Sequence, residues 1–316
     1  HRILQLIFMD KNFENIIKIK GGLSKKNIFR KFEKKLNKII IDFSENKEDF
    51  YNFLNVYNIL KNINVSIPKI YEVHNNILVI VMEDFGEKKI DKICNENNYY
   101  SLIKSSVECL VIIQNNLVSD DLIKLQKYTH EEFTKDISEF ILHFIPFKKI
   151  INFPIDEFYK IWKKIFENLK INFTSFAHKD FEFINLFFLN KNNSYLKIGV
   201  IDFQSAFISF VGWDLFSILE NPRNNFSRKY NEELISYFYN SISTKLEFNE
   251  FRQQYYLLNL SRQTRLLGRW AKLIQEKNDN IYNEFISATH NKLKICLENV
   301  DDVALKLAYK NILDSN

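Results

Sequence analysis

Apolar residues in the first third of the chain fall into short runs, several of them alternating with polar residues, as in β-strands. One segment among them differs, because Phe50, Phe53 and Tyr57 recur at the spacing of a helix. Ser44 lies just ahead of this segment and is its predicted N-cap. The strands are predicted at residues 15–20, 27–31, 38–43, 69–73 and 77–82. The pattern therefore predicts a small β-rich region containing one helix.

The pattern changes after Gly86, where helical periodicity takes over. A strand-loop-strand region is predicted at residues 175–203. Helices are predicted at residues 99–116, 131–144, 154–172, 213–220, 231–245, 250–276, 280–297 and 303–313. The chain is thus expected to form a small β-rich lobe, residues 1–85, and a larger helical lobe, residues 86–316. The predicted fold class is α+β.

Glycine is scarce: the chain has 6 in 316 residues, where average usage would give about 22. A glycine that persists in such a composition marks a position where the backbone needs positive φ or a close approach. The six glycines are Gly21, Gly22, Gly86, Gly199, Gly212 and Gly268. The hydrophobic content of 46% is that of a globular protein. Collagen-like and disordered chains are therefore excluded.

Charge and cysteine usage narrow the class of protein further. The net charge is +5, with the charges interspersed, so we expect no nucleic-acid partner. No apolar run approaches the roughly 18 residues of a membrane span, so we expect no membrane partner. The three cysteines are far apart and lack metal-site spacing, which predicts reduced thiols in a cytoplasmic protein. Because the first residue is His1, we expect that native N-terminal residues or a tag are missing before it.

The chemistry is concentrated in one stretch, His178-Lys179-Asp180-Phe181-Glu182-Phe183-Ile184-Asn185, followed by a strand and Asp202. Phosphoryl transfer needs a carboxylate that takes or orients the hydroxyl proton, and oxygen ligands that hold Mg²⁺ against the phosphates. Asp180 fits the first role, with His178 as a supporting residue. Asn185 and Asp202 fit the metal ligands. The alternative is a turn with a structural histidine, which the following Ile201-Asp202-Phe203 makes less attractive.

A later carboxylate, Asp214, follows Gly212 and Trp213. With it, the sequence resembles the aminoglycoside phosphotransferase family of the protein-kinase-like superfamily. The resemblance implies a two-lobed kinase-like fold, and it implies that Asp214 supports the catalytic loop. A helix N-terminal charge is the alternative role for Asp214, compatible with the first. A protein kinase is not indicated, because no A-P-E segment follows Asp202.

Within the superfamily, the chain is most similar to the bacterial anomeric kinases of N-acetylmuramate and N-acetylglucosamine. The resemblance runs from about residue 21 to about residue 273. It is carried by Ile201-Asp202-Phe203-Gln204, Trp213-Asp214-Leu215-Phe216, Glu83-Asp84-Phe85-Gly86 and Arg262-Gln263-Thr264-Arg265-Leu266-Leu267-Gly268-Arg269. It implies an ATP- and Mg²⁺-dependent transferase that phosphorylates the anomeric hydroxyl of an amino sugar in cell-wall sugar recycling. We expect a monomer or a weak homodimer.

The same resemblance suggests nucleotide contacts in the first lobe. Gly21, Gly22 and Ser24 fall where a loop covers the phosphates, although a plain Gly-Gly hairpin is an equal alternative. Glu83 and Phe85 fall at the hinge, where backbone groups would meet adenine. An ordinary strand-to-helix turn is the alternative there.

One part of the fold is missing from the sequence. Kinases of this fold carry a lysine on the third strand, but this chain has Ile39-Ile40-Ile41-Asp42 there. Which lysine, if any, replaces it stays open. Glu48 is a candidate for the helix glutamate of the fold, with a solvated N-terminal acid as the favoured alternative.

Arg262 and Arg265 share one face of a predicted helix and are candidates for binding an acidic sugar. A solvated basic face is the alternative. Two further functions stay open. One is an aminoglycoside-, choline- or homoserine-type kinase of the same fold, and the other is a catalytically silent nucleotide-binding module.

Overall fold

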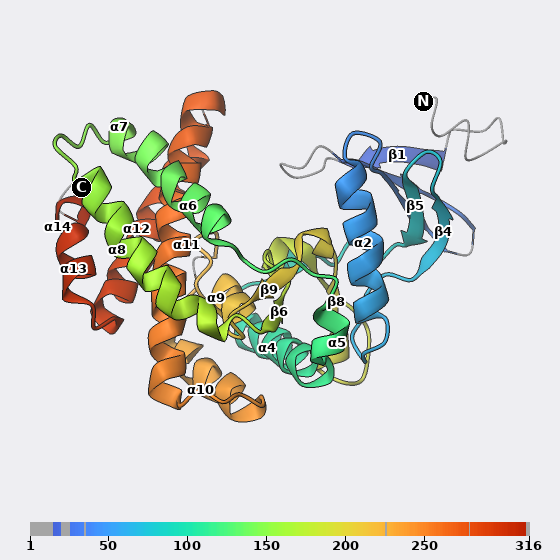
Figure 1. Ribbon diagram of the computed structural model, residues 1–316. Coiled ribbons are helices and arrows are strands. Elements are labelled where there is room, and N and C mark those ends of the chain that lie inside the picture. The colour runs from blue at the N-terminus through green and yellow to red at the C-terminus, as the bar shows by residue number, and fades with distance from the viewer. Residues whose placement is uncertain (1–14, 20–25, 35, 225, 278, 314–316) are drawn as a thin grey trace. The chain divides into compact units, whose positions relative to one another are not determined.

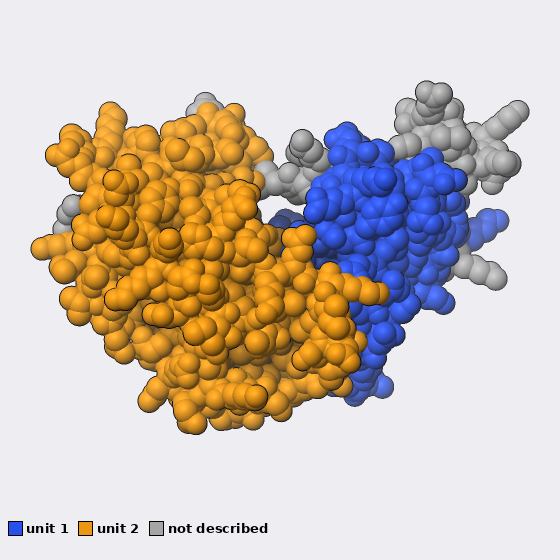
Figure 2. All heavy atoms as spheres, viewed as in Figure 1, with its two compact units in different colours: residues 1–95, 183–206 blue, residues 96–182, 207–316 orange. Residues whose placement is uncertain are grey.

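The computed structural model describes residues 15–19, 26–34, 36–224, 226–277 and 279–313. Its contacts divide the chain into two compact units, coloured separately in Figure 2. Unit 1 comprises residues 1–95 and 183–206, and unit 2 comprises residues 96–182 and 207–316. The contacts therefore place the boundary differently from the predicted lobes of residues 1–85 and 86–316.

Unit 1 is built on a five-stranded antiparallel sheet with the strand order β1-β2-β3-β5-β4. Its strands are β1 (Ile16–Ile19), β2 (Asn27–Lys31), β3 (Lys38–Asp42), β4 (Ile70–His74) and β5 (Val79–Glu83). All five predicted strands are present. Ile40, Val79 and Val81 are fully buried and form the centre of an apolar cluster on this sheet. The helix α2 (Lys47–Leu60) runs beside the sheet in Figure 1 and buries Phe50 and Phe53.

The beginning of α2 corrects the predicted cap. Asn46, not Ser44, is the N-cap, because the Asn46 Oδ1 accepts a hydrogen bond from the Asp49 amide at 3.1 Å. The Ser44 amide instead donates to Asp42 Oδ1 at 2.8 Å, in the turn that leaves β3. Asn46 is two residues closer to the first helical turn, which lets its short side chain reach the third amide of the helix.

The segment from residue 183 to 206 packs with unit 1 although the helical lobe was expected to contain it. It forms the hairpin β7 (Leu186–Phe188) and β8 (Ile198–Val200). Backbone bridges join Ser66 to Gly199 and Lys89 to Phe187. The rings of Phe53 and Phe203 also stack with centroids 4.7 Å apart. These contacts depend on pairings across more than 90 residues of chain, which local periodicity does not encode.

Unit 2 is mainly helical. Its principal elements are α4 (Tyr99–Asn116), α6 (His130–Glu139), α8 (Ile155–Leu169), α9 (Trp213–Leu219), α10 (Asn231–Ser241), α11 (Phe248–Lys277), α12 (Ile281–Asn299) and α13 (Val303–Ala308). The short strands β6 (Ser175–Ala177) and β9 (Phe207–Ser209) pair with each other. The predicted helices are present, with ends that shift by a few residues.

The long helix α11 is the axis of unit 2, with α12 and α6 alongside it in Figure 1. Gly268 on α11 allows the end of α6 to approach the α11 backbone closely. A Cβ atom at Gly268 would lie 2.3 Å from the carbonyl carbon of Glu139, where α6 passes into a π-helical turn at Phe140–Phe144. Only glycine permits this backbone contact. Among the described helices, none has the length and apolar character needed to cross a bilayer.

Candidate active site

The loop that carries Asp180 is held by the side chain of Asp214, and both belong to unit 2. The Asp214 side chain is buried and accepts hydrogen bonds from the amides of His178, at 2.7 Å, and Lys179, at 3.1 Å. The Trp213 indole donates to the Lys179 carbonyl at 3.4 Å. Lys179 takes a φ of 79°, which a non-glycine residue adopts only when its surroundings enforce it. The structure thus brings His178, Asp180 and Asp214 together, as the sequence suggested.

The charges around Asp180 act in opposite directions. Burial raises the pKa of Asp180, and the neighbouring Glu182 carboxylate raises it further. Arg265, His178 and Lys179 oppose this rise. Burial also raises the pKa of Asp214 to about 7, against the two backbone amides that favour its ionised form. Asp180 therefore sits in surroundings that strengthen it as a base.

Arg265 is held by a second carboxylate. Its Nε lies 3.7 Å from Asp136 Oδ1 on α6, and Asp136 Oδ2 accepts a hydrogen bond from the Tyr128 hydroxyl at 2.6 Å. About a quarter of the Arg265 side chain is exposed (23%). Arg265 thus combines a partial pairing with an accessible surface and an electrostatic interaction with Asp180.

Arg262 has a different environment from Arg265. Its side chain is buried, and its Nη2 lies 2.6 Å from Glu182 Oε1. Arg223 Nη1 lies 2.6 Å from the other oxygen of Glu182 and its guanidinium lies over the Trp270 ring. Burial would raise the pKa of Glu182, but nearby groups, chiefly these two guanidinium groups, outweigh it and lower that pKa. Arg262 is therefore not part of a solvated basic face, and its role toward substrate stays a prediction.

The two predicted metal ligands lie in unit 1. Asn185 is buried, and its carbonyl accepts a hydrogen bond from the Ile201 amide at 3.1 Å, next to Asp202. Asp202 follows β8 in the left-handed conformation, with φ 64° and ψ 38°. Such a conformation costs on the order of 1–3 kcal/mol in a non-glycine residue and is concentrated at functional sites. The backbone conformation therefore marks Asp202 as a position that the surrounding structure fixes.

Lys26 is a site residue that sequence reasoning did not identify. It immediately precedes β2, and its Nζ lies 2.6 Å from Asp202 Oδ1. Only 3% of the Lys26 side chain is exposed. Gln204 Nε2 donates to the same Asp202 oxygen at 3.2 Å. Nothing in the local sequence distinguishes Lys26 from the adjacent Lys25, because its partner is 176 positions away.

The acid on α2 that interacts with this pair is Asp49. Burial raises the pKa of Asp49, Lys26 lowers it in part, and Asp202 raises it. Glu48, the candidate from the sequence, is exposed, as the solvated-acid alternative expects.

The donors in unit 1 suit Mg²⁺. One amide and one carboxylate, from Asn185 and Asp202, are the small oxygen set that Mg²⁺ takes from a protein when phosphates and waters complete its shell. The Asp202 carboxylate already has a positive partner, because the Lys26 ammonium lies 2.6 Å from its Oδ1. Within the described part of the chain, no group of three or more His, Cys, Asp or Glu side chains forms another metal site.

The predicted hinge is an ordered turn after β5. Arg30 on β2 pairs with Asp84, Nε to Oδ2 at 2.7 Å, and donates to the Gly86 carbonyl at 2.9 Å. Gly86 takes a φ of 84°. The Phe85 ring lies against Gly199, where a Cβ atom would be 2.6 Å from the ring. Glu83 and Phe85 thus flank a turn fixed to both β2 and β8.

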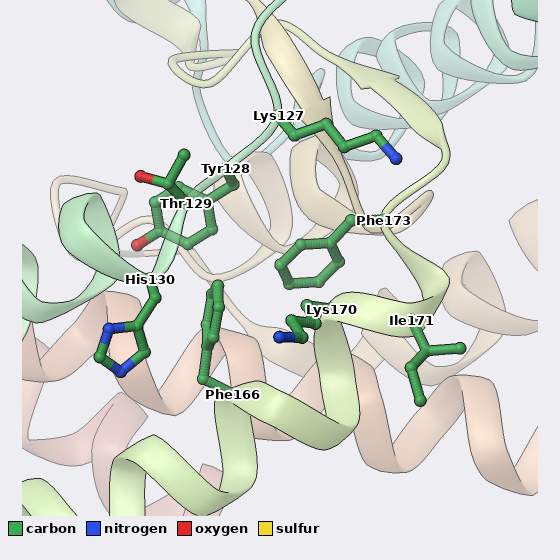
Figure 3. Close-up of a pocket in the computed structure, with 8 residues that line it drawn as sticks. All are labelled: Lys127, Tyr128, Thr129, His130, Phe166, Lys170, Ile171 and Phe173. Carbon is green, nitrogen blue, oxygen red and sulfur yellow. The ribbon is translucent and has the colours of Figure 1, made fainter.

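The predicted phosphate loop of Gly21, Gly22 and Ser24 lies outside the described residues. A separate hollow lies within unit 2, with a volume of about 450 Å³ (Figure 3). Its lining is Lys127, Tyr128, Thr129, His130, Phe166, Lys170, Ile171 and Phe173. None of the residues predicted for the site lines it.

Comparisons with known proteins lead to kinases. The model of the ecdysteroid kinase-like family matches residues 105–250. The N-acetylmuramate/N-acetylglucosamine kinase of Caulobacter vibrioides is 26% identical over 140 residues. That match covers 44% of this chain and 38% of the relative, so the chain spans well under half of the relative's length. The predicted resemblance to this group of kinases is confirmed.

Solved structures extend the likeness over nearly the whole chain. The ADP-bound aminoglycoside phosphotransferase APH(2'')-Ib has a TM-score of 0.58 and 13% identity, covering 95% of this chain and 98% of the other. The choline kinase LicA from Streptococcus pneumoniae has a TM-score of 0.59 and 10% identity, covering 94% and 95%. At these identities the likeness concerns the fold, and the predicted kinase-like fold class is confirmed.

Proposed function

We propose that this protein is an ATP- and Mg²⁺-dependent phosphotransferase acting on a hydroxyl group of a small molecule. The observation that carries the proposal is the loop of Asp180, whose preceding amides are both bound by buried Asp214. The fold shared with aminoglycoside phosphotransferases and a choline kinase supports the same reaction class. The match to the ecdysteroid kinase-like family adds further support.

The residues divide the work of phosphoryl transfer. Asp180 accepts the proton of the acceptor hydroxyl as its oxygen attacks the terminal phosphorus of ATP and the bond to the bridging oxygen breaks. Asn185 and Asp202 hold Mg²⁺, which neutralises charge on the phosphates when bound. Asp214 keeps the loop in place, and the hinge at Glu83 and Phe85 offers backbone groups to adenine. The raised pKa of Asp180 suits a base that works near neutral pH.

As acceptor we propose the anomeric hydroxyl of N-acetylmuramate or N-acetylglucosamine. The named activity of the Caulobacter relative supports this choice. The partly exposed Arg265 near Asp180 supports it too, because a guanidinium group opposes a cationic acceptor and favours a neutral or acidic one. A cationic substrate such as an aminoglycoside or choline would need acidic groups to balance its charge.

A panel of acceptors tests the proposal. Purified protein is incubated with Mg·ATP and each of N-acetylmuramate, N-acetylglucosamine, choline, homoserine and an aminoglycoside, and products are followed by phosphorus NMR. We expect the signal of a sugar 1-phosphate with one of the amino sugars, and no signal with Asp180→Asn. Turnover of choline, homoserine or the aminoglycoside alone would refute the amino-sugar assignment and retain the reaction class.

The second candidate is a kinase of the same fold for those cationic or amino-acid acceptors, and the structural neighbours favour it. The third is a catalytically silent nucleotide-binding module, motivated by the apolar third strand. Binding of Mg·ATP by the wild-type protein without turnover of any acceptor in the panel would favour that module.

A further inference from the structure

The third strand of unit 1 supplies no cation to the nucleotide site. Its central residue, Ile40, is fully buried against Val79 and Val81. Lys38, at the beginning of β3, pairs with Glu33 at 3.3 Å. Lys18, on β1, is exposed. A lysine that binds phosphate in this structure must therefore come from another position.

Lys26 occupies a suitable position by strand register. Asn27 pairs with Asp42 in the β2–β3 ladder, so the residue before Asn27 lies beside the end of β3. Accordingly, the Lys26 ammonium lies 5.6 Å from the centroid of the Phe43 ring. The same ammonium contacts Asp202, the proposed metal ligand, at 2.6 Å. The pairing of β2 with β3 thus places the Lys26 ammonium beside the end of β3, a strand with no lysine at its buried positions.

The burial of Lys26 needs an explanation. An ammonium group that is almost fully removed from water is costly unless a carboxylate compensates it. Here the compensating carboxylate belongs to Asp202, whose own side chain is 36% exposed. Lys26 is thus almost fully buried, whereas Asp202 is partly open to solvent and takes the left-handed conformation. The pair thus places a buried ammonium group beside a carboxylate that solvent, and therefore a ligand, can reach.

We propose that Lys26 is the residue that binds the nucleotide phosphates, and that Asp202 holds its ammonium group while no nucleotide is bound. The inference rests on the proposed function. When Mg·nucleotide enters, Lys26 exchanges the Asp202 oxygen for a phosphate oxygen, and Asp202 becomes available to the metal. Asp49 on α2 remains as a nearby negative charge for Lys26. No covalent bond changes in this exchange.

The competing explanation is a structural ion pair, and nucleotide binding separates the two. Lys26→Met keeps the length of the side chain and removes its charge, while Lys26→Arg keeps a charge. Lys38→Met is the matched control, because Lys38 also belongs to the sheet but pairs with Glu33. Affinities for Mg·ADP and for adenosine, which has no phosphate, are measured by isothermal titration calorimetry. Urea unfolding of each nucleotide-free variant reports stability.

We expect Lys26→Met to weaken Mg·ADP binding roughly 10- to 100-fold, the size of a charged hydrogen bond. Adenosine binding stays within twofold (about 0.4 kcal/mol) of wild type. Lys26→Arg recovers part of the loss, and Lys38→Met binds as wild type does.

Unchanged Mg·ADP affinity in Lys26→Met, or equal losses for Mg·ADP and adenosine, would overturn the proposal while leaving the reaction class intact. A wild-type protein that binds neither ligand would instead refute the proposed function, and this inference with it. The two failures therefore give different titration results.

Discussion

Asp180 and Asp202 are both motif aspartates beside a basic side chain, yet their surroundings differ. The Asp202 carboxylate contacts Lys26 directly at 2.6 Å. Around Asp180, the basic side chain of Arg265 is drawn toward Asp136, and Glu182 adds negative charge. A carboxylate meant for a metal can be stored as an ion pair, whereas a base must keep its lone pairs available. The difference supports the proposed roles, Asp202 as metal ligand and Asp180 as base.

The backbone makes the same distinction. Asp202 is itself in the left-handed region, with a φ of 64°. At the other aspartate, the left-handed residue is its neighbour Lys179, and Asp214 fixes that turn through two amides. The unusual backbone therefore belongs to the proposed metal ligand itself, whereas the proposed base has it in a neighbour that a supporting side chain fixes.

The largest expected effect comes from neutralising each aspartate. Asp180→Asn is expected to lower turnover roughly 10²- to 10⁴-fold, the usual contribution of a general base. Its affinity for Mg·ADP should stay within about twofold of wild type. Asp202→Asn should lose both turnover and the Mg²⁺ dependence of ADP binding. Coupled assays and calorimetry check this, and a loss of Mg·ADP binding in Asp180→Asn would contradict the division of tasks.

The next largest expected effect is on stability, through the two arginines that pair with Glu182. Arg262→Met should reduce the free energy of unfolding by about 3 kcal/mol, because it leaves Glu182 buried with one partner fewer. Arg223→Met should cost less than about 1 kcal/mol, because 30% of that side chain is exposed and water replaces its charge. Urea unfolding measures both. Equal losses would show that Glu182 does not depend chiefly on the buried guanidinium.

Two glycines provide a matched steric test, one in each unit. A Cβ atom would lie 2.6 Å from Phe85 Cε2 at Gly199, and 2.6 Å from Phe210 Cε1 at Gly212. Each alanine variant should lose about 2 kcal/mol of stability by overpacking. Gly199→Ala should also weaken Mg·ADP binding, and Gly212→Ala should lower turnover through Asp214. If Gly199→Ala lowered only turnover and Gly212→Ala weakened only Mg·ADP binding, this division between the two units would be refuted.

The smallest expected effect is on the pH profile. Burial raises the pKa of Asp180 and Arg265 opposes that rise, so Arg265→Met should raise this pKa further. Protonated Asp180 cannot accept a proton, so the fall of kcat on the acidic side should begin at a higher pH. Arg269→Met is the control, because Arg269 pairs with Glu139 at 3.4 Å. Identical shifts in the two variants would show that Arg265 has no specific influence on Asp180.

The sequence predicted what depends on short spacing. Asp180, Asn185 and Asp202 lie in one stretch of chain with a recognisable order, and the strands and helices follow local periodicity. Lys26 could not be found in this way, because its meaning lies in a contact 176 positions away. The buried state of Arg262 was equally hidden, since it lies at helical spacing from Arg265 and Arg269, which are only partly buried. Charges gain their roles from tertiary neighbours, which periodicity does not report.

The position of Lys26 also affects what the small sheet can become. Lys26 places its charge just before β2. In the middle strand, β3, Ile40 and Ile41 fill the interior instead. A buried isoleucine contributes roughly 1.5–3 kcal/mol, which a lysine at that place would forfeit. Substitutions within β3 can therefore improve packing without changing the charge that Lys26 supplies before β2. In this protein, a lysine at position 40 would place its charge in the apolar cluster with Val79 and Val81.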